Sequence, residues 1–367
     1  MTRLRQLLLV LPLFFTIIWS TPSKAQDTTV QVGIILPLSG AGASVGDAIR
    51  NGMTIGLEQL DAGVRKRIEV FYEDDALLPK NTVVAFQKLV ATNKVDLVIC
   101  AGSAAGKAIA PLAEQLRIPL IAIASDHEIV RDRTHVVNFW VTPEEEVRVL
   151  VPEMVRRNYK KVAIISATHD GPISIMKNFD QMNQGKFEVV LAEDYPQEAR
   201  DFRAFIAKLR TKEQVDAILI LLYAGQNGLF AKQLRQQKLD IPLIGVEFFE
   251  DADEVKSSEG ALVGHWFVNY DEPNDEFMKK FKERFPNSST MAAGNGHDVI
   301  LLIGAAVAKD SKREALNTFL HTVSNFSGAL GTFSASGDNR FTLPAAVKIV
   351  TDDGFKKVAQ GSTQVSG

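Results

Sequence analysis

Apolar and polar residues follow two alternating patterns in the first part of the chain, one typical of β-strands and one typical of helices. Short apolar runs, typical of buried β-strands, occupy residues 30–36, 67–72, 95–100 and 119–124. Segments with the helical spacing of apolar residues lie between them, at residues 44–60, 81–93 and 104–116. Strands that alternate with helices form parallel sheets with helices on both faces. The pattern therefore predicts an α/β unit.

The same alternation starts again after residue 142. We expect helices at residues 143–157, 199–210 and 227–237, and strands at residues 161–166, 187–191, 216–222 and 242–246. In the second of these helices, four apolar residues share one face at the i, i+3, i+4 and i+7 positions, namely Phe202, Phe205, Ile206 and Leu209. The pattern predicts a second α/β unit of the same kind, without a detectable sequence repeat.

The chain becomes mostly helical after about residue 270. Phe277, Phe281 and Phe285 line one helix, and residues 292–309 form a long apolar helix, while short strands are expected near 331–334 and 346–350. Helices without a sheet of their own cannot bury their apolar faces alone, so we expect them to cover the first unit. Crossovers near residues 140, 270 and 333 would then form a three-stranded hinge. The predicted lobes are residues 26–141 plus 270–332, and residues 142–269 plus 333–367.

The first 25 residues have the layout of a cleaved secretory signal peptide. Arg3 and Arg5 precede an apolar run from Leu7 to Trp19, and small residues at Ser23 and Ala25 predict cleavage after Ala25. A retained membrane anchor is the alternative, but the run is shorter than the ~20 residues that span a bilayer. We expect a freely diffusing periplasmic protein.

Cleavage would leave 342 residues (367 − 25). The full sequence has 46% hydrophobic and 23% charged residues, a composition typical of an ordinary globular protein. Loss of Arg3, Arg5 and Lys24 changes the formal charge from −3 to −6. An acidic chain without a basic block argues against nucleic acid or an anionic membrane as partner. The single cysteine, Cys100, excludes an intramolecular disulfide and is expected to be a buried, inert thiol.

Several segments, taken in order, resemble the branched-chain amino-acid-binding proteins of ABC importers, which are type I periplasmic binding proteins. The segments are residues 33–40, Gly46, 50–52, 72–75, 110–114, 118–121, 294–298 and 331–334. The resemblance covers nearly the whole mature chain. It implies two Rossmann-like, doubly wound lobes joined by a three-stranded hinge, with a ligand bound between them. It also implies a monomer that needs no cofactor and presents its ligand to the membrane subunits of an ABC permease.

The resemblance assigns ligand contacts to two loops of the first lobe. Gly102, Ser103 and Ala104 join a strand to a helix N-terminus, where free N–H groups suit an anion such as a ligand carboxylate. The alternative is that Ser103 only caps its own helix. Ser125 and Asp126 end the next strand and are expected to contact the ligand, unless they form an ordinary helix cap.

In the second lobe, the resemblance matches Glu247 to the acidic residue that pairs with a ligand ammonium group. A solvated acid is the alternative, because four other acidic residues follow closely. His169 and Asp170 lie on the first strand-to-helix loop of this lobe, where a ligand contact is also expected. Tyr223 lies near the site, although we expect it to remain within its strand.

The predicted pocket contains few aromatic residues. Positions that hold rings in the family correspond here to Val45, Gly171 and Gln226, and Ser39 belongs to the first loop of the site. Missing rings leave space, and His169 and Gln226 add hydrogen-bonding groups. The sequence therefore predicts a ligand that is larger or more polar than leucine.

Three other chemistries are disfavoured. The glycines at residues 40–46 with the acids at 73–75 resemble a dinucleotide site, but Pro37 and Ser39 interrupt it and its spacing is wrong. Ser166, His169 and Asp170 are the residue types of a hydrolase triad, but they lie close together on one loop, and the sequence has no G-x-S-x-G nucleophile elbow. The histidines lack metal-binding spacing. We therefore expect no enzyme activity.

A periplasmic sensor that signals to a receptor remains the alternative to import, because the same lobes serve both functions.

Overall fold

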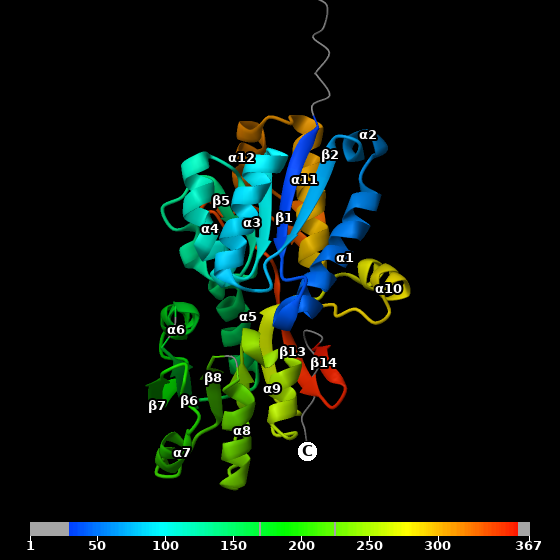
Figure 1. The fold of residues 1–367 in the computed structure, drawn as a ribbon. Coiled ribbons are helices and arrows are strands. Elements are labelled where there is room, and N and C mark those ends of the chain that lie inside the picture. Colours follow the sequence, from blue (N-terminus) through cyan, green and yellow to red (C-terminus); the bar gives the residue numbers. More distant parts are fainter. Residues whose placement is uncertain (1–28, 169, 224, 359–367) are drawn as a thin grey trace, which may run out of the picture.

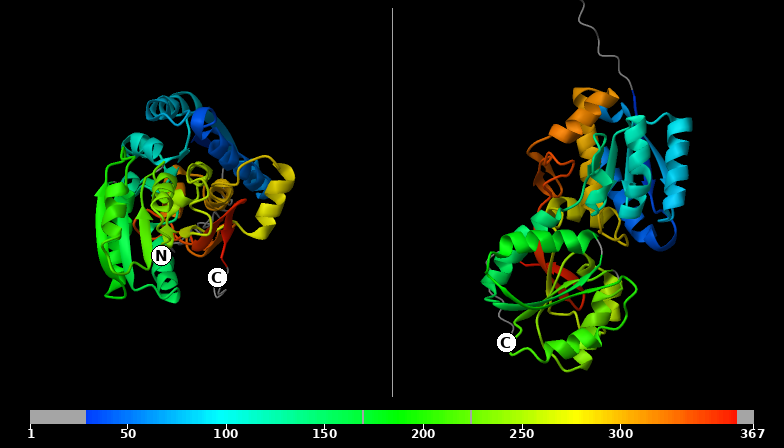
Figure 2. Two further views of the ribbon diagram at one scale, coloured as in Figure 1. Left: turned by 90° about the horizontal axis from the view of Figure 1, so that it is seen from below. Right: turned by 90° about the vertical axis from the view of Figure 1, so that its left-hand side faces the viewer.

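Two lobes make up the computed structural model, which describes residues 29–358 except 169 and 224 (Figure 1). The predicted signal peptide lies outside the described residues. Each lobe is built around one sheet with helices on both faces, and the lobes lie end to end (Figure 2). This arrangement confirms the predicted doubly wound α/β fold.

The first lobe contains a five-stranded parallel sheet in the order β2-β1-β3-β4-β5. Its strands are β1 (Val30–Leu36), β2 (Ile68–Asp74), β3 (Leu97–Ala101), β4 (Leu120–Ile123) and β5 (Val136–Asn138). Its helical elements are η1 (Gly40–Gly42), α1 (Ala43–Gln59), α2 (Ala62–Arg65), α3 (Pro79–Lys88), η2 (Leu89–Asn93), α4 (Ser103–Leu116) and η3 (His127–Val130). The central strands are almost wholly buried, as continuous apolar runs require in a sheet covered on both faces.

The second lobe contains a seven-stranded sheet in the order β14-β13-β10-β9-β8-β6-β7. Its strands are β6 (Lys161–Ala167), β7 (Glu188–Tyr195), β8 (Ala217–Leu221), β9 (Leu243–Gly245), β10 (Trp266–Tyr270), β13 (Ala345–Thr351) and β14 (Gly354–Lys357). Its helical elements are α5 (Pro143–Arg156), α6 (Asp170–Asn183), α7 (Arg203–Leu209), α8 (Asn227–Gln236), η4 (Glu247–Phe249) and α9 (Ala252–Ser257). Five strands are parallel, and β13 and β14 add an antiparallel edge.

The late helices return to the first lobe. They are α10 (Asp275–Arg284), α11 (Ala293–Lys309) and α12 (Arg313–Thr322), followed by a hairpin of β11 (Phe326–Gly328) and β12 (Gly331–Phe333). Helix α11 lies against α1 at very short range (Figure 1). A Cβ atom at Gly52 of α1 would lie 1.9 Å from the carbonyl oxygen of Ala293, so this crossing requires glycine.

Three chain segments connect the lobes: residues 139–142, 271–274 and 334–344. The first and third of these segments are held together by an aromatic cluster in which the ring of Phe139 lies 5.2 Å from that of Phe333 and 5.0 Å from that of Phe341. The backbone N–H of Asn138 also donates to the carbonyl of Asn339 at 2.8 Å. The connection therefore has a packed centre of its own.

Candidate functional site

A cavity of about 230 Å³ lies between the lobes, where loops at the carboxyl ends of both parallel sheets meet. This edge is where open α/β sheets bind ligands. Residues of both lobes and of the segment between them line the cavity: Ser103, Ala104, Lys107, Ser125, Asp126, Val141, Pro143, Glu146, Gly171, Pro172, Ile175, Leu221, Leu222, Tyr223, Val246 and Glu247. The structure thus brings together six of the residues predicted from the sequence, namely Ser103, Ala104, Ser125, Asp126, Tyr223 and Glu247.

The N-terminus of α4 forms one side of the cavity. Gly102 precedes it with a φ of +96°, a conformation that residues with a side chain rarely adopt. Gly102 has no side chain that could cap this helix, and the first turn of α4, which lies within the described residues, holds no acidic residue. Instead, the Ser103 hydroxyl oxygen accepts a hydrogen bond from the backbone N–H of Asp126 at 3.4 Å. The first N–H groups of α4 therefore remain available to an anion.

Asp126 orders the neighbouring loop. Its Oδ1 accepts from the backbone N–H of Glu128 at 2.9 Å, and its Oδ2 lies 2.6 Å from Nζ of Lys107. Its side chain is 4 % exposed, whereas that of Lys107 is 44 % exposed. Both carboxylate oxygens thus have partners within the first lobe, and Lys107 adds a positive charge to the cavity lining that sequence analysis did not identify.

Glu247 reaches the cavity from the second lobe, at the start of η4. Its carboxyl group is hydrogen-bonded by the side chain of Ser125, which belongs to the first lobe. Removal from solvent raises the pKa of Glu247, and the negative charge of Asp126 acts in the same direction, while the Ser125 hydrogen bond opposes them. The alternative of a fully solvated acid does not describe this environment.

Glu146 is a further acidic residue of the cavity that sequence analysis did not identify. It lies in the first turn of α5, after the cap formed by Thr142, and is 5 % exposed. Burial is the main reason that its pKa is raised well above its ordinary value, with the negative charge of Glu247 as a further cause. Glu144 and Glu145 precede it in sequence, and acidic residues are common in a first helical turn. The sequence alone therefore did not distinguish Glu146 from an ordinary helix-end acid.

The remaining cavity wall is mainly aliphatic. Val141, Ile175, Leu221, Leu222 and Val246 contribute branched apolar side chains. Tyr223 is the aromatic side chain among the described residues of this lining. The expectation that Tyr223 remains within its strand is wrong, because β8 ends at Leu221 and the following loop carries Tyr223 to the cavity.

Other predicted ligand contacts lie outside this lining. Ser39 is exposed and its backbone N–H donates to Asp74 at 3.2 Å, while Val45 packs against the core of the first lobe. Gln226 is wholly buried. Its Oε1 accepts from the backbone N–H of Tyr223, and its Nε2 donates to three carbonyl groups of the residue 196–199 loop.

The structure does not describe His169, and it gives no side-chain environment for Asp170. The prediction that His169 and Asp170 contact the ligand therefore stays a prediction. The remaining predicted residue, Gly102, lies immediately before the lining residues Ser103 and Ala104.

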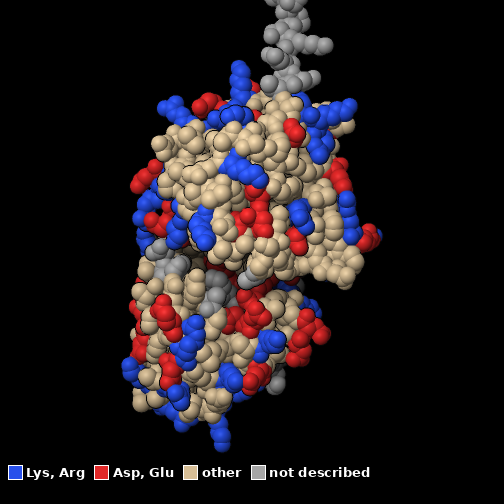
Figure 3. Space-filling view, viewed as in Figure 1, with Lys and Arg blue, Asp and Glu red and all other residues tan. Residues whose placement is uncertain are grey.

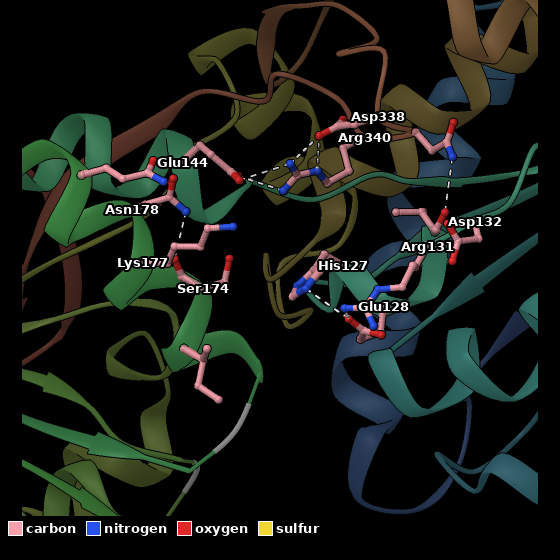
Figure 4. A pocket seen from close by; sticks show the side chains of 14 residues that line it. His127, Glu128, Arg131, Asp132, Glu144, Ser174, Lys177, Asn178, Asp338 and Arg340 are labelled. Carbon is pink, nitrogen blue, oxygen red and sulfur yellow. Dashed lines mark hydrogen bonds and ion pairs between the residues drawn. The ribbon is translucent and has the colours of Figure 1, made fainter.

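A wider and more open cavity of about 780 Å³ lies between η3 and α6 (Figure 4). Most charged groups that line it already pair with one another. Arg340 binds Glu144 at 2.8 Å and also pairs with Asp338, and Arg131 pairs with Glu128. Three residues that line it, His127, Glu144 and Ile173, are adjacent in sequence to residues that line the smaller cavity. We therefore regard this space as the outer part of the same interlobe opening. Figure 3 shows the waist between the lobes, with positive and negative side chains interspersed over the rest of this face.

Some of the segments that were weighed for other chemistries can be placed in the structure. The glycines at residues 40–42 form the short helix η1, and Oδ1 of Asp74 accepts hydrogen bonds from the backbone N–H groups of Leu38 and Ser39. Cys100 is buried in β3, and burial raises its pKa. Among the described residues, we find no metal-binding cluster and no helix that is long and apolar enough to cross a membrane.

The sequence matches the family model of periplasmic binding proteins over residues 29–354. A curated relative, the Leu/Ile/Val-binding protein BraC3 of Rhizobium johnstonii, is 22% identical over 259 residues, which cover 65% of this chain and 67% of the relative.

Solved structures show the same fold at low sequence identity. The leucine-binding protein LivK of Thermotoga maritima has a TM-score of 0.76 and 19% identity, with 90% of this chain and 98% of that chain covered. A solute-binding protein of an ABC transporter from Rhodopseudomonas palustris BisB5, in complex with 3,4-dihydroxybenzoic acid, has a TM-score of 0.73 and 24% identity, with 91% and 97% covered. The relatives thus include binding proteins for quite different solutes.

Proposed function

The chain belongs to the periplasmic binding protein family, a family of solute-binding proteins rather than enzymes, and we propose that it captures an amino acid or a related small polar or anionic solute for an ABC importer. The cavity between the lobes is the observation that carries this proposal, because it presents a helix N-terminus on one side and the partly buried carboxyl group of Glu247 on the other. We infer a periplasmic location from the family and from the predicted signal peptide.

The two sides of the cavity suit opposite charges. The uncapped N–H groups of α4, next to Ser103, would bind a carboxylate of the solute. Glu247 would bind its ammonium group, since a charge-assisted hydrogen bond is among the stronger polar contacts in proteins. The aliphatic wall between them would contact the solute's side chain.

Closure of the lobes would follow from this arrangement. Ser103 belongs to the first lobe and Glu247 to the second, so a solute that binds both favours the closed state. The three connecting segments allow such movement without separating the lobes. A permease that recognises the closed form would then receive loaded protein in preference to empty protein.

A thermal-shift screen followed by calorimetry tests the proposal. Protein stripped of bound solutes by unfolding and refolding is screened against amino acids, amides, short peptides and aromatic acids. A solute at a hundredfold excess over its dissociation constant should stabilise the protein by about 2.7 kcal/mol. If no solute in any class raises the melting temperature, the proposed function is wrong.

Two variants assign the binding to this cavity. Glu247→Gln should weaken binding of an ammonium-bearing solute by about tenfold or more, because it removes a charge-assisted hydrogen bond. Glu259→Gln is the matched control, since Glu259 pairs with Lys232 on the surface and its side chain is 69% exposed. Equal affinities for the two variants would contradict the role of Glu247.

A further inference from the structure

Glu146 is a buried acidic group without a complete set of partners. Its Oε1 has no hydrogen-bond partner among the described residues, although Glu146 is only 5 % exposed and lines the cavity. The backbone N–H of Glu247 donates to its carboxyl group. A buried polar atom without a partner is costly in a folded protein, so its retention in a binding cavity indicates a partner that arrives from outside.

The charges that the described residues bring to the cavity lining do not balance. Four charged side chains of the described part of the chain line it: Lys107, Asp126, Glu146 and Glu247. Lys107 and Asp126 form an ion pair at 2.6 Å. No cationic side chain of the described residues pairs with Glu146 or Glu247. The outer neighbour Glu144 is also acidic, but it is already bound by Arg340. Two carboxyl groups therefore face one small cavity without a positive charge between them.

We propose that Glu146 and Glu247 together form a cation subsite, and that the solute carries a protonated nitrogen group with N–H donors for both carboxylates. A primary ammonium, an amidinium or a guanidinium group has this chemistry. The inference rests on the proposed function and narrows it, because it makes the cationic group of the solute a requirement and assigns it two acidic partners. A carboxylic acid without such a nitrogen does not satisfy the subsite.

Electrostatics supports the geometry. Burial raises the pKa values of both carboxyl groups, and each lies in the field of another negative charge: Glu247 acts on Glu146, and Asp126 acts on Glu247. A cation placed between like charges relieves both their repulsion and their loss of hydration. Of the cationic side chains that line the cavity, Lys107 is held by Asp126 on the α4 side. The described part of the lining therefore supplies no positive charge for Glu146 and Glu247, and the proposal assigns that charge to the solute.

A competition experiment tests the subsite directly. Solute-free protein is incubated with an equimolar pool of L-leucine, L-arginine, agmatine, benzamidine, benzoate, 4-methylpentanoate and benzamide, and the retained solutes are identified by mass spectrometry. We expect every retained solute to carry a protonated nitrogen. Glu146→Gln should reduce retention of these solutes by about tenfold or more, because a neutral amide replaces one charged acceptor.

Glu145→Gln is the matched control. It makes the same chemical change in the same helical turn, but Glu145 pairs with Arg148 outside the cavity lining. This variant should retain the pool as the unmodified protein does. Thermal unfolding of both variants shows whether they are folded, and Glu146→Asp, which keeps the charge, should recover part of the retention that Glu146→Gln loses.

The outcomes separate this inference from the proposed function. Preferential retention of benzoate or 4-methylpentanoate overturns the cation subsite and leaves solute capture intact. Equal retention by folded Glu146→Gln and Glu145→Gln also overturns it. Failure of the unmodified protein to retain any solute, either from this pool or from the broader screen, overturns the proposed function and this inference with it.

Discussion

The contact between α1 and α11 gives a sharp prediction for Gly52→Ala. The added Cβ atom would lie 1.9 Å from the carbonyl oxygen and 2.8 Å from the carbonyl carbon of Ala293. Both are backbone atoms, so no side chain can rotate away. Ordinary contact begins at 3.4 Å, and the helices must therefore separate by about 1.5 Å (3.4 − 1.9) at this point.

The expected loss of stability follows from this displacement. Overpacking of a well-packed interior costs about 1–3 kcal/mol, and rigid backbone neighbours favour the upper end of that range. Alanine is favoured over glycine in a helix by about 1 kcal/mol, which offsets part of the cost. The difference between the two gives a net loss of stability of about 2 kcal/mol. Gly56 and Gly296 also make close contacts along the same crossing, which opposes a local adjustment of the two helices.

Urea unfolding and hydrogen exchange measure this effect. Gly52→Ala should unfold at lower urea concentration, and backbone amides of α1 and α11 should exchange faster while those of β6 and β8 keep their rates. Gly63→Ala in α2 is the control, because its Cβ would approach only the side-chain Oδ1 of Asp61, at 3.0 Å. A Gly52→Ala protein as stable as the unmodified chain would refute the reasoning about the helix crossing.

Three further predictions concern buried charges. Asp298→Asn should destabilise the protein by about 3 kcal/mol in thermal unfolding, because Asp298 accepts two backbone N–H groups of the turn before β12, at 2.6 and 2.8 Å; an unchanged melting temperature would contradict this. Lys348→Met should cost about 3–5 kcal/mol by leaving Glu250 without its cation at 2.6 Å, and addition of Glu250→Gln should recover much of that loss in the same assay. The pKa of Glu146 is raised above 4.5 in the folded state, so the folded protein holds this proton more tightly than the unfolded chain, and stability should fall as pH rises from 4.5 through the folded-state pKa. Glu146→Gln should remove this part of the pH dependence and Glu145→Gln should not, as melting temperatures across the pH range would show.

The elements with a strong apolar pattern were predictable. The strand expected at residues 30–36 is β1, and the long helix expected at 292–309 begins one residue later as α11. A helix was implied after the loop at His169 and Asp170, but the bounds of α6, residues 170–183, were not predicted, because its apolar face is short and the segment contains glycine and proline. Strand β5 has only three residues, too few for a recognisable alternation.

The candidate site was predictable where a residue ends a parallel strand. Ser125 and Glu247 follow β4 and β9, and strand ends of one sheet share an edge. Lys107 and Glu146 were missed because they reach the cavity from within helices, where only the packing of α4 and α5 decides which face is turned inward. Gln226 looks like a polar ligand contact in sequence, but the fold uses its amide to hold the residue 196–199 loop.

The return of α11 to the first lobe has a consequence for the order in which the chain folds. The helix covers the partner face of α1, yet 250 residues separate the last residue of α1 from the last residue of α11 (309 − 59). At ordinary rates of synthesis, this interval lasts roughly 10 to 50 s. Throughout that time the apolar surface of α1 has been synthesised, but the helix that covers it has not. The nascent first lobe therefore needs protection from aggregation until almost the entire polypeptide has been made.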